Sequence, residues 1–541
     1  MRLILTSLFF ICLFGCNKSQ TEDVINFDEE ASQESGGTLT NAMIGEPNNL
    51  IAMIAGDGAS SAIAGQIFNS LLKYDENLEF EGDLAESWEV SEDYKTIRFN
   101  LKTKKKWSDD HPITCKDVLF TWKAVTHPDT RTPYGSDYQL VSSAECINDY
   151  QFIAKYNEPY APALETWASL HILPEHLLKN EDINNTYFSL NPVGSSYYAL
   201  DSWVTGQQLK LKANPNAIHG KPLIDNKVSR IIPDLSSQFM ELIAGNIDLM
   251  SINPIQYSRV FPNRSELNNK INLYKEMGNG YTYFGFNLNK KPFDDINIRK
   301  AISYAIDRQE IIDGVLLGLG EEITSPYKPG TYWENKNIKK LSFNPQKAKE
   351  LLEKSGYHLN NNIYEKDGIP LSFEILTNQN KQREMTAVLI QRRLQDIGID
   401  VSIRVIEWAS FVNRFIKTGE FQAVVLGWSL SLDPDQYSIW HSSQQGPGQF
   451  NFIGYSNKRV DDLLEKGRQE LNKEKRKAIY DEFSAILYED QPIVYLYAGY
   501  GLSAIHKKIK GVKKLSPPAG IYHNDYEWFV PTKFRRNEMS L

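Results

Sequence analysis

The chain has 541 residues, of which 41% are hydrophobic, 23% charged and 12% aromatic, and its formal net charge is −9 at pH 7. This composition excludes disorder over most of the length, and a typical domain size of about 100–200 residues predicts two or three domains. The mildly acidic balance argues against nucleic acid as a partner, and the lack of any apolar run of roughly 18–20 residues excludes a multispanning membrane protein.

The beginning of the chain predicts export. Arg2 precedes the apolar run 3–14, which is too short for a membrane span and suits a secretory signal peptide over residues 1–15. The run ends in Leu-Phe-Gly-Cys, which resembles the bacterial lipobox, so we expect cleavage before Cys16 and lipid on its sulfur. An ordinary secretory signal with an incidental cysteine is the alternative.

Residues 16–37 predict a tether. The segment is acidic, rich in Ser and Gln, and ends in Gly36-Gly37. Such a composition buries too little apolar surface to order itself. We therefore expect a flexible chain of roughly 25 Å that holds the body of the protein off a membrane.

The body contains two cysteines, Cys115 and Cys146. In an oxidising compartment they could form a disulfide, and two buried thiols are an equally good interpretation. Two cysteines are too few for a disulfide framework or a cysteine-rich metal site.

The first part of the body mixes strands and helices. Strands are predicted at 38–44 and 71–74 around a helix near 60–69. Alternation of polar and apolar residues predicts a half-buried strand at 96–101. Apolar residues on one face predict a helix at 114–125.

The stretch 286–430 has a more regular pattern. Asp294-Asp295 precedes a helix with its apolar face between Ile298 and Ile312. The elements that follow are a strand at 371–376, a helix at 387–397 ended by Gly398, a strand at 399–405, a helix at 408–416 and a strand at 421–428. This order predicts a βαβαβ lobe. A helix at 473–488 and an apolar strand at 493–497 come after it.

The chain lacks the common catalytic and metal-binding motifs, and its nine histidines are scattered. Asp433 and Asp435 form a carboxylate pair, but Pro434 between them predicts a turn, and no acid or base partner is close in sequence. We therefore expect no enzyme, no cofactor and no metal.

Two blocks of sequence point to a family. Ala85–Ser91, Lys106-Trp107-Ser108-Asp109 and the Asp117-Val118 pair form the first block, and Lys291–Asp295 with Ile298–Arg308 forms the second. Together with Gly427-Trp428 and Asp433-Pro434 they resemble the family 5 extracellular solute-binding proteins, the peptide-, dipeptide- and nickel-binding components of ABC importers.

That resemblance implies an α/β fold of the periplasmic-binding-protein type, with two lobes joined by a hinge (type II) and an extra domain inserted in the first lobe. The implied bounds are 38–73, 191–285 and 496–541 for the first lobe, 74–190 for the inserted domain, and 286–495 for the second lobe.

The implied function is capture of a peptide in the cleft between the lobes and its delivery to a membrane permease. Closure on the ligand is a population shift, so the ligand has to contact both lobes. The expected partners are the ABC permease and ATPase subunits, with a lipid-anchored, extracytoplasmic monomer as the binding subunit. The same fold binding a sugar or a nickel complex, and a surface interaction or chaperone-like lipoprotein, are the alternatives.

One position departs from the family. Peptide binders of the family hold the ligand's α-ammonium on an aspartate a few residues after the Gly-Trp pair, and the matching position is Ser431. Asp433 or Asp435 could replace it, with turn chemistry and helix capping as the alternative role. The other candidate ligand contacts are Asp57, Ser60, Tyr281, Tyr283, Trp408, Gly427 and Trp428.

Overall fold

A computed structural model of the chain describes residues 27, 31–278, 280–513 and 520–535. The predicted signal peptide, the predicted lipidation site Cys16 and most of the predicted tether lie outside these residues. Among the described residues, no helix combines the length and the apolar character that crossing a membrane requires.

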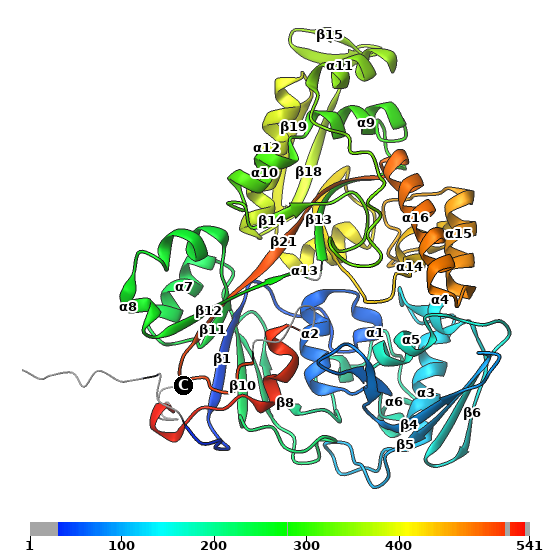
Figure 1. Cartoon of the computed structure of the whole chain (residues 1–541), viewed down its shortest axis with the longest axis vertical. Coiled ribbons are helices and arrows are strands. Elements are labelled where there is room, and N and C mark those ends of the chain that lie inside the picture. The colour runs from blue at the N-terminus through cyan, green and yellow to red at the C-terminus, as the bar shows by residue number, and fades with distance from the viewer. Residues whose placement is uncertain (1–26, 28–30, 279, 514–519, 536–541) are drawn as a thin grey trace, which may run out of the picture.

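One long strand organises the molecule. Strand β21 (Ile493–His506) lies inside a 12-stranded sheet with the order β19-β18-β20-β13-β21-β11-β1-β10-β9-β8, and β12 and β14 also pair with β21. Its first half pairs with β13 (Gly280–Phe286), and its second half pairs with β11 (Leu249–Ser251) and β12 (Ile271–Met277). Figure 1 shows β21 running from the upper part of the molecule into the lower part.

The buried side chains divide in the same way. Tyr281 of β13 and Tyr495 of β21 share a hydrophobic cluster with the helices above them, whereas Leu502 and Ala504 belong to a cluster in the lower part. We call residues 280–499 the upper lobe, and residues 31–278, 500–513 and 520–535 the lower lobe. The predicted bounds at 285/286 and 495/496 fall inside β13 and β21, and they stay predictions.

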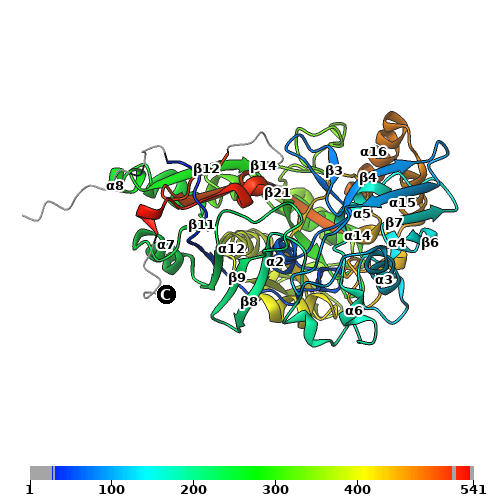
Figure 2. The same cartoon turned by 90° about the horizontal axis from the view of Figure 1, so that it is seen from below.

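The lower lobe contains two further sheets. The strands β4, β5, β7 and β6 form an antiparallel sheet in that order, and β2 pairs with β3. Figure 2 shows the four-stranded sheet at one end of this lobe and α7 and α8 at the other end. Within the lower lobe the strands are β1 (Thr38–Met43), β2 (Leu72–Tyr74), β3 (Phe80–Gly82), β4 (Ala85–Val90), β5 (Thr96–Leu101), β6 (Val141–Asn148), β7 (Gln151–Tyr156), β8 (Tyr198–Val204), β9 (Gln208–Ala213), β10 (Asn226–Ile231), β11 and β12. Its helices are α1 (Ala52–Ala55), α2 (Gly58–Ile67), α3 (Cys115–Thr126), α4 (Gly135–Tyr138), α5 (Ala163–Ser169), α6 (Glu175–Leu178), α7 (Leu235–Ile243) and α8 (Ser265–Asn268).

Local chemistry explains the start of α3. Thr114 accepts a hydrogen bond from the backbone of Lys116, and Asp117 accepts one from the backbone of Thr114, which together form a capping box. A disulfide joins Cys115 at the start of α3 to Cys146 of β6. Of the two interpretations of these cysteines, pairing is the one that the structure supports.

The buried core of the lower lobe does not separate the predicted inserted domain, 74–190, from its surroundings. Phe99 and Trp167 inside that range pack in one cluster with Ile67 before it and Tyr198 after it. The inserted domain therefore stays a prediction about the family fold, not a separate hydrophobic core.

The upper lobe confirms the predicted βαβαβ order. Strand β18 (Ser372–Asn378) pairs in parallel with β19 (Asp400–Ile406) and with β20 (Ala423–Ser429). Gly398 follows α12 (Lys381–Asp396) with φ +91°, a conformation that favours glycine after a helix. The remaining elements are α9 (Ile296–Ala305), α10 (Arg308–Gly314), β14 (Gly320–Glu322), α11 (Pro345–Lys354), β15 (His358–Asn360), β16 (Ile363–Lys366), β17 (Ile369–Pro370), α13 (Trp408–Ser410), α14 (Tyr437–Trp440), α15 (Lys458–Gln469) and α16 (Lys473–Asp490).

The end of the predicted tether contacts the lower lobe. Glu34 accepts hydrogen bonds from the backbone and the hydroxyl of Thr532, and the Gly36 backbone donates to the carbonyl of Leu223. Arg535 donates to the carbonyl of Ser35. Contacts with the body thus begin several residues before the predicted start at Thr38.

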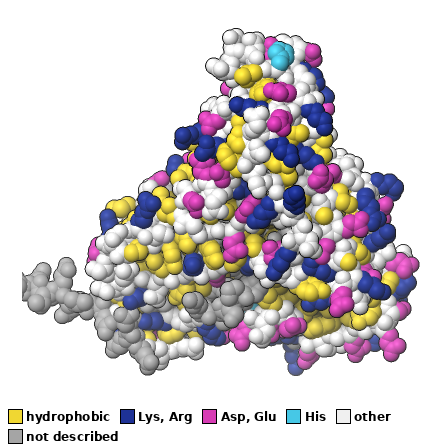
Figure 3. Space-filling view, turned by 45° about the horizontal axis from the view of Figure 1, so that its top comes forward, with side chains coloured by type: hydrophobic (Ala, Val, Ile, Leu, Met, Phe, Trp, Pro, Cys, Tyr) yellow, Lys and Arg dark blue, Asp and Glu magenta, His cyan; other side chains and the backbone are white. Residues whose placement is uncertain are grey.

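The surface charges of the described residues are mixed. Figure 3 shows basic and acidic side chains interspersed over both lobes on the face it presents. On that face the net negative charge of the chain is therefore not gathered into one area.

Candidate functional site

The candidate site is a cavity of about 500 Å³ between the two lobes. From the lower lobe it is lined by the turn between α1 and α2 and by residues of α4 and α5. From the upper lobe it is lined by Trp408, the end of β20 and the loops on either side of α14. A ligand in this cavity touches both lobes, which is the requirement for a ligand that stabilises a closed state.

Direct contacts hold the lobes together around the cavity. Asn413 Nδ2 of the upper lobe donates to Asn48 Oδ1 of the lower lobe at 2.9 Å, and Gln449 Nε2 donates to the Thr132 carbonyl at 2.9 Å. The Ala161 backbone donates to the Arg468 carbonyl at 2.7 Å. The two lobes are therefore in direct contact at several points around the cavity.

The structure brings seven of the ten predicted contact residues to this cavity. They are Asp57, Trp408, Gly427, Trp428, Ser431, Asp433 and Asp435. The indole Nε1 of Trp408 lies 3.4 Å from Asp57 Oδ1 across the lobe boundary. Trp428 packs edge-on against Phe450, which also lines the cavity, so this wall is aromatic.

Three predicted residues do not line the cavity. Ser60 is fully buried and donates to Asp57 Oδ2 at 2.6 Å, so it supports the carboxylate at the start of α2. Tyr281 and Tyr283 are buried in the upper lobe, and the Tyr283 ring is stacked behind Trp428. Both tyrosines lie on β13 and face the core of the lobe, so their prediction as cavity-lining contacts is not met in this structure.

The carboxylates of Asp433 and Asp435 form ion pairs with arginines. Both carboxylate oxygens of Asp433 accept from Arg476, at 2.6 and 2.7 Å. Asp435 accepts from Arg468 Nε at 2.8 Å and from the Tyr437 backbone at 3.1 Å. Asp433 also accepts from the Asp435 backbone, as the turn interpretation predicts. Ser431 donates to the Asp433 carbonyl at 2.9 Å.

Arg468 connects the lobes as well. Its guanidinium is bonded to Asp137 of α4, on the opposite side of the boundary, and lies 3.8 Å from the centre of the Tyr437 ring. Burial raises the pKa of Asp137, and Arg468 opposes that shift. Burial alone would lower the pKa of Arg468, but Asp435, Tyr160 and Asp137 together outweigh burial and raise that pKa.

Glu165 of α5 differs from these paired groups. It lines the cavity, its Oε2 is buried, and that atom has no hydrogen-bond partner among the residues that the structure describes. Burial, and then repulsion by Asp433, raises the pKa of Glu165 to about 8. At neutral pH this carboxyl therefore carries a proton in the structure as it stands.

Another cationic side chain of the cavity is Lys417, which follows the π-helical turn 411–416. Burial lowers its pKa, and Asp57 opposes the shift. The cavity is thus lined by the carboxyl of Glu165 on the lower lobe and by a lysine on the upper lobe.

The sequence of the chain matches a known protein family. The family described as "Bacterial extracellular solute-binding proteins, family 5 Middle" matches residues 79–450. The chain belongs to family 5 of the bacterial extracellular solute-binding proteins. The residues that carried the resemblance in the sequence lie mostly within or beside this match.

Relatives of this family 5 chain bind different ligands. The oligopeptide-binding protein AppA of Bacillus subtilis is 31% identical over 546 residues, which covers 98% of each protein. The structure of AppA in complex with a nonapeptide matches with a TM-score of 0.87, over 93% of this chain and 100% of that one. NikZ from Campylobacter jejuni, in complex with Ni(L-His), matches with a TM-score of 0.83 at 27% identity, over 91% of this chain and 99% of that one.

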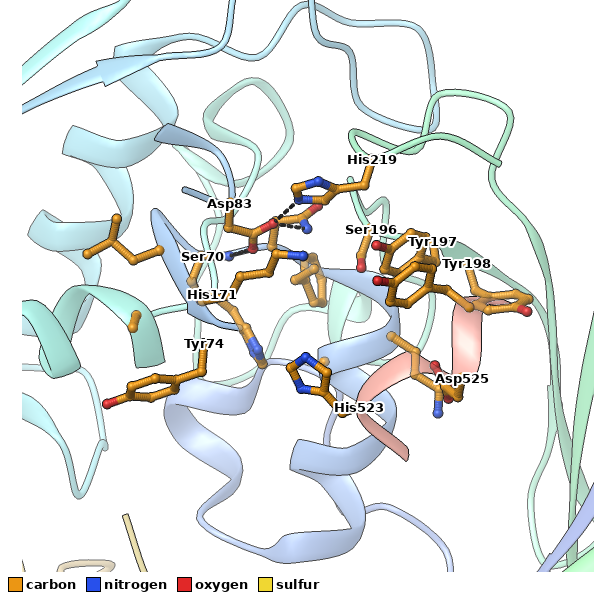
Figure 4. Close-up of a pocket in the computed structure, with 18 of the residues that line it drawn as sticks. Ser70, Tyr74, Asp83, His171, Ser196, Tyr197, Tyr198, His219, His523 and Asp525 are labelled. Carbon is orange, nitrogen blue, oxygen red and sulfur yellow. Dashed lines mark hydrogen bonds and ion pairs between the residues drawn. The ribbon is translucent and has the colours of Figure 1, made fainter. Parts of the chain in front are cut away.

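A second cavity of about 300 Å³ lies within the lower lobe of the family 5 chain. In it His219 Nε2 lies 2.6 Å from Asp83 Oδ1, and Asp83 also accepts from Asn69 and from the Ser70 backbone (Figure 4). Burial lowers the pKa of His171 there to about 4. Since all its lining residues belong to one lobe, a ligand in it would not link the lobes.

Sequence reasoning missed several residues of the interlobe cavity. Glu165, Lys417, Tyr134 and Phe450 line it, and Arg468 and Arg476 pair its acidic residues. Two arginines eight positions apart after an Asp-Pro-Asp turn are a weak signal for pairing. No pattern in the sequence marks Glu165. In the part of the chain that the structure describes, no group of three or more His, Cys, Asp or Glu side chains is placed to hold a metal ion.

Proposed function

We propose that the chain is the substrate-binding subunit of an ABC importer that captures peptides between its lobes and delivers them to a membrane permease. The observation that carries this proposal is the cavity lined by both lobes of a family 5 chain. The similarity to AppA, whose solved structure holds a nonapeptide, supports a peptide as the ligand.

The volumes of the interlobe cavity and of a neighbouring cavity suit a peptide. Its volume of about 500 Å³ lies within the range of small-molecule sites. Another interlobe cavity, of about 390 Å³, adjoins the same Trp408 and contains Arg383. A longer ligand would extend from one cavity past Trp408 toward the other.

The upper lobe offers backbone as well. Strand β20 pairs with β18 only at Ala423 and Val424, while its continuation through Gly427 and Ser429 lines the cavity. An extended peptide could add to such an edge through main-chain hydrogen bonds, which do not depend on its sequence.

The same proposal includes a lipid anchor on Cys16, a place outside the cytoplasm, and permease and ATPase subunits as partners of a monomer. Its support is the signal-like start of the chain and the extracellular family. Mass spectrometry of the mature protein tests the anchor. A diacylated N-terminal cysteine at position 16 is the expected result, and an unmodified N-terminus beyond that residue would contradict it.

Native mass spectrometry and thermal shift test the capture of peptides. We expect co-purifying peptides in the native spectrum and a rise in melting temperature with members of a peptide library. A clean spectrum together with no shift across the library would refute the proposal.

A non-peptide solute is the second candidate function. It is favoured by NikZ with Ni(L-His) and by the heme-binding protein A of Haemophilus influenzae, which is 26% identical over 93% of this chain and 94% of that protein. Ser431 at the position of the family's aspartate also favours it. Stabilisation by such a ligand, with none by peptides, would select this candidate.

A further inference from the structure

At the acidic wall of the interlobe cavity, two arginines pair with three of the four carboxyl groups. Four carboxyl groups line this wall, on Asp137, Glu165, Asp433 and Asp435. Two arginines face them: Arg468 pairs with Asp137 and Asp435, and Arg476 pairs with both oxygens of Asp433. Glu165 is left without a partner for its buried oxygen among the described residues.

The arginines are not available to turn toward Glu165. Arg468 is buried and stacks on Tyr437 while it pairs with two carboxylates. Arg476 donates its Nε to the Gly467 carbonyl at 2.8 Å while its two terminal nitrogens hold Asp433. Moving either of them would leave a buried carboxylate unpaired, which is more costly than the pairing it would create.

We propose that Glu165 binds the positively charged end of the ligand, a primary ammonium group, in the place of the aspartate that this chain lacks at Ser431. The inference rests on the proposed capture of peptides. A carboxylate and an ammonium satisfy each other by charge-assisted hydrogen bonds, which are the strong ones in a site with little water. The ammonium comes either from the amino terminus of a peptide or from a lysine side chain.

The position of Glu165 on the lower lobe gives this bond a second effect. Asp433 belongs to the upper lobe and interacts electrostatically with Glu165 in the structure. Ionisation of Glu165 alone would place two carboxylates against each other across the lobe boundary, whereas an ammonium between them attracts both. The charged end of the ligand therefore favours the closed state directly.

Binding also changes the protonation of the site. The groups that face the acidic wall are Asp137 of α4, Asp433 and Asp435 before α14, and Arg468 and Arg476 of α15 and α16. Glu165 is protonated at pH 7, and a salt bridge needs the carboxylate. Binding of an ammonium at pH 7 therefore releases about one proton from Glu165.

The test compares peptide libraries that differ in their amino groups. The probes are Ser-Thr-Ser-Ala and a lysine-free tetrapeptide library, each with a free and with an acetylated amino terminus, and an acetylated library that contains one lysine. Thermal shift selects the binders, and titration calorimetry at pH 7 measures their affinities. In buffers of different ionisation enthalpy, the same titrations measure the proton release.

We expect the wild-type protein to prefer an ammonium by roughly 10- to 100-fold over its acetylated counterpart, the range for a hydrogen bond to a charged group. Glu165→Gln removes both the preference and the proton release, and Glu165→Asp keeps part of the preference. Glu158→Gln is the matched control, because Glu158 is an exposed glutamate of the same lobe that pairs with Lys95. It leaves both readouts unchanged.

The possible outcomes separate the inference about Glu165 from the proposed capture of peptides. Preference for a free terminus, or for the lysine of the acetylated library, supports the inference and identifies the source of the ammonium. Equal affinities with and without an ammonium, or a preference that survives in Glu165→Gln, overturn the inference and leave peptide capture intact. Binding of no peptide by the wild-type protein overturns both.

Discussion

The two cavities of the molecule each bury an ionisable side chain, but the surroundings of these side chains differ. Burial shifts the pKa of a side chain in each cavity toward the neutral form: it raises that of Glu165 in the interlobe cavity to about 8 and lowers that of His171 in the lower lobe to about 4. Glu165 faces residues of the other lobe, whereas His171 is surrounded by residues of its own lobe.

The difference bears on the role that we propose for Glu165. Neutralising His171 leaves an imidazole packed against Phe68 inside one lobe, and the local structure accounts for it. Neutralising Glu165 leaves a carboxyl in a cavity that both lobes line. A perturbed pKa in a cleft between moving parts is thus more informative than an equal shift inside a rigid one.

The largest effect is expected from removing the cation that bridges the interlobe cavity. Arg468→Met leaves Asp137 and Asp435 buried without a positive partner, so we expect the free energy of unfolding at pH 7 to fall by about 3–5 kcal/mol. Denaturant unfolding measures it.

Arg459→Met is the matched control on the same helix, because Arg459 forms an exposed pair with Glu482. Its effect is expected to stay below about 1 kcal/mol. Equal effects of the two variants would mean that the buried bridge contributes no more than a surface pair. The deficit of Arg468→Met should also shrink at low pH, as its two carboxylates become protonated.

The next effect separates Glu165 from an ordinary surface glutamate. Its folded pKa is raised, so the folded protein binds more protons than the unfolded chain, and stability is lost as pH rises through about 8. Glu165→Gln is therefore expected to gain about 2–4 kcal/mol relative to wild type between pH 5 and pH 9. A difference that does not change with pH would show that Glu165 is ionised in the folded protein.

The opposite pH dependence is expected for the second cavity. The folded pKa of His171 is lowered, so its contribution is complete above pH 6.5 and is lost as pH falls toward 4. His171→Phe should gain roughly 2–3 kcal/mol relative to wild type over that window. The exposed His127 provides the control variant His127→Gln, for which no such gain is expected. A gain in peptide affinity on acidification that depends on His171 would contradict the separation of the two cavities.

The smallest effect is expected at the contact between the lobes. Trp408→Phe keeps an aromatic ring beside Gly45 but removes the hydrogen bond to Asp57. Loss of about 0.5–1.5 kcal/mol from the closed state should lower peptide affinity roughly two- to tenfold in titration calorimetry. An unchanged affinity would mean that this contact does not favour closure.

The sequence was sufficient for elements whose causes are local. Gly398 ends its helix as predicted, and the alternating pattern at 96–101 is a strand with those bounds. Pairing of Cys115 with Cys146 stayed open because it depends on the distance between α3 and β6. The site was partly predictable for the same reason: Trp408 follows β19 and Trp428 lies near the end of β20, but Glu165 enters from a short helix far away in sequence.

Strand β21 also determines when the molecule can finish folding. It is made after every other strand of the large sheet, yet β13 of the upper lobe and β11 and β12 of the lower lobe all pair with it. The upper part of the large sheet is incomplete until about residue 499 has been made, and the lower part until about residue 506. The two lobes therefore reach their final form together, and a chain that stops short of β21 lacks the strand on which both sheets are built.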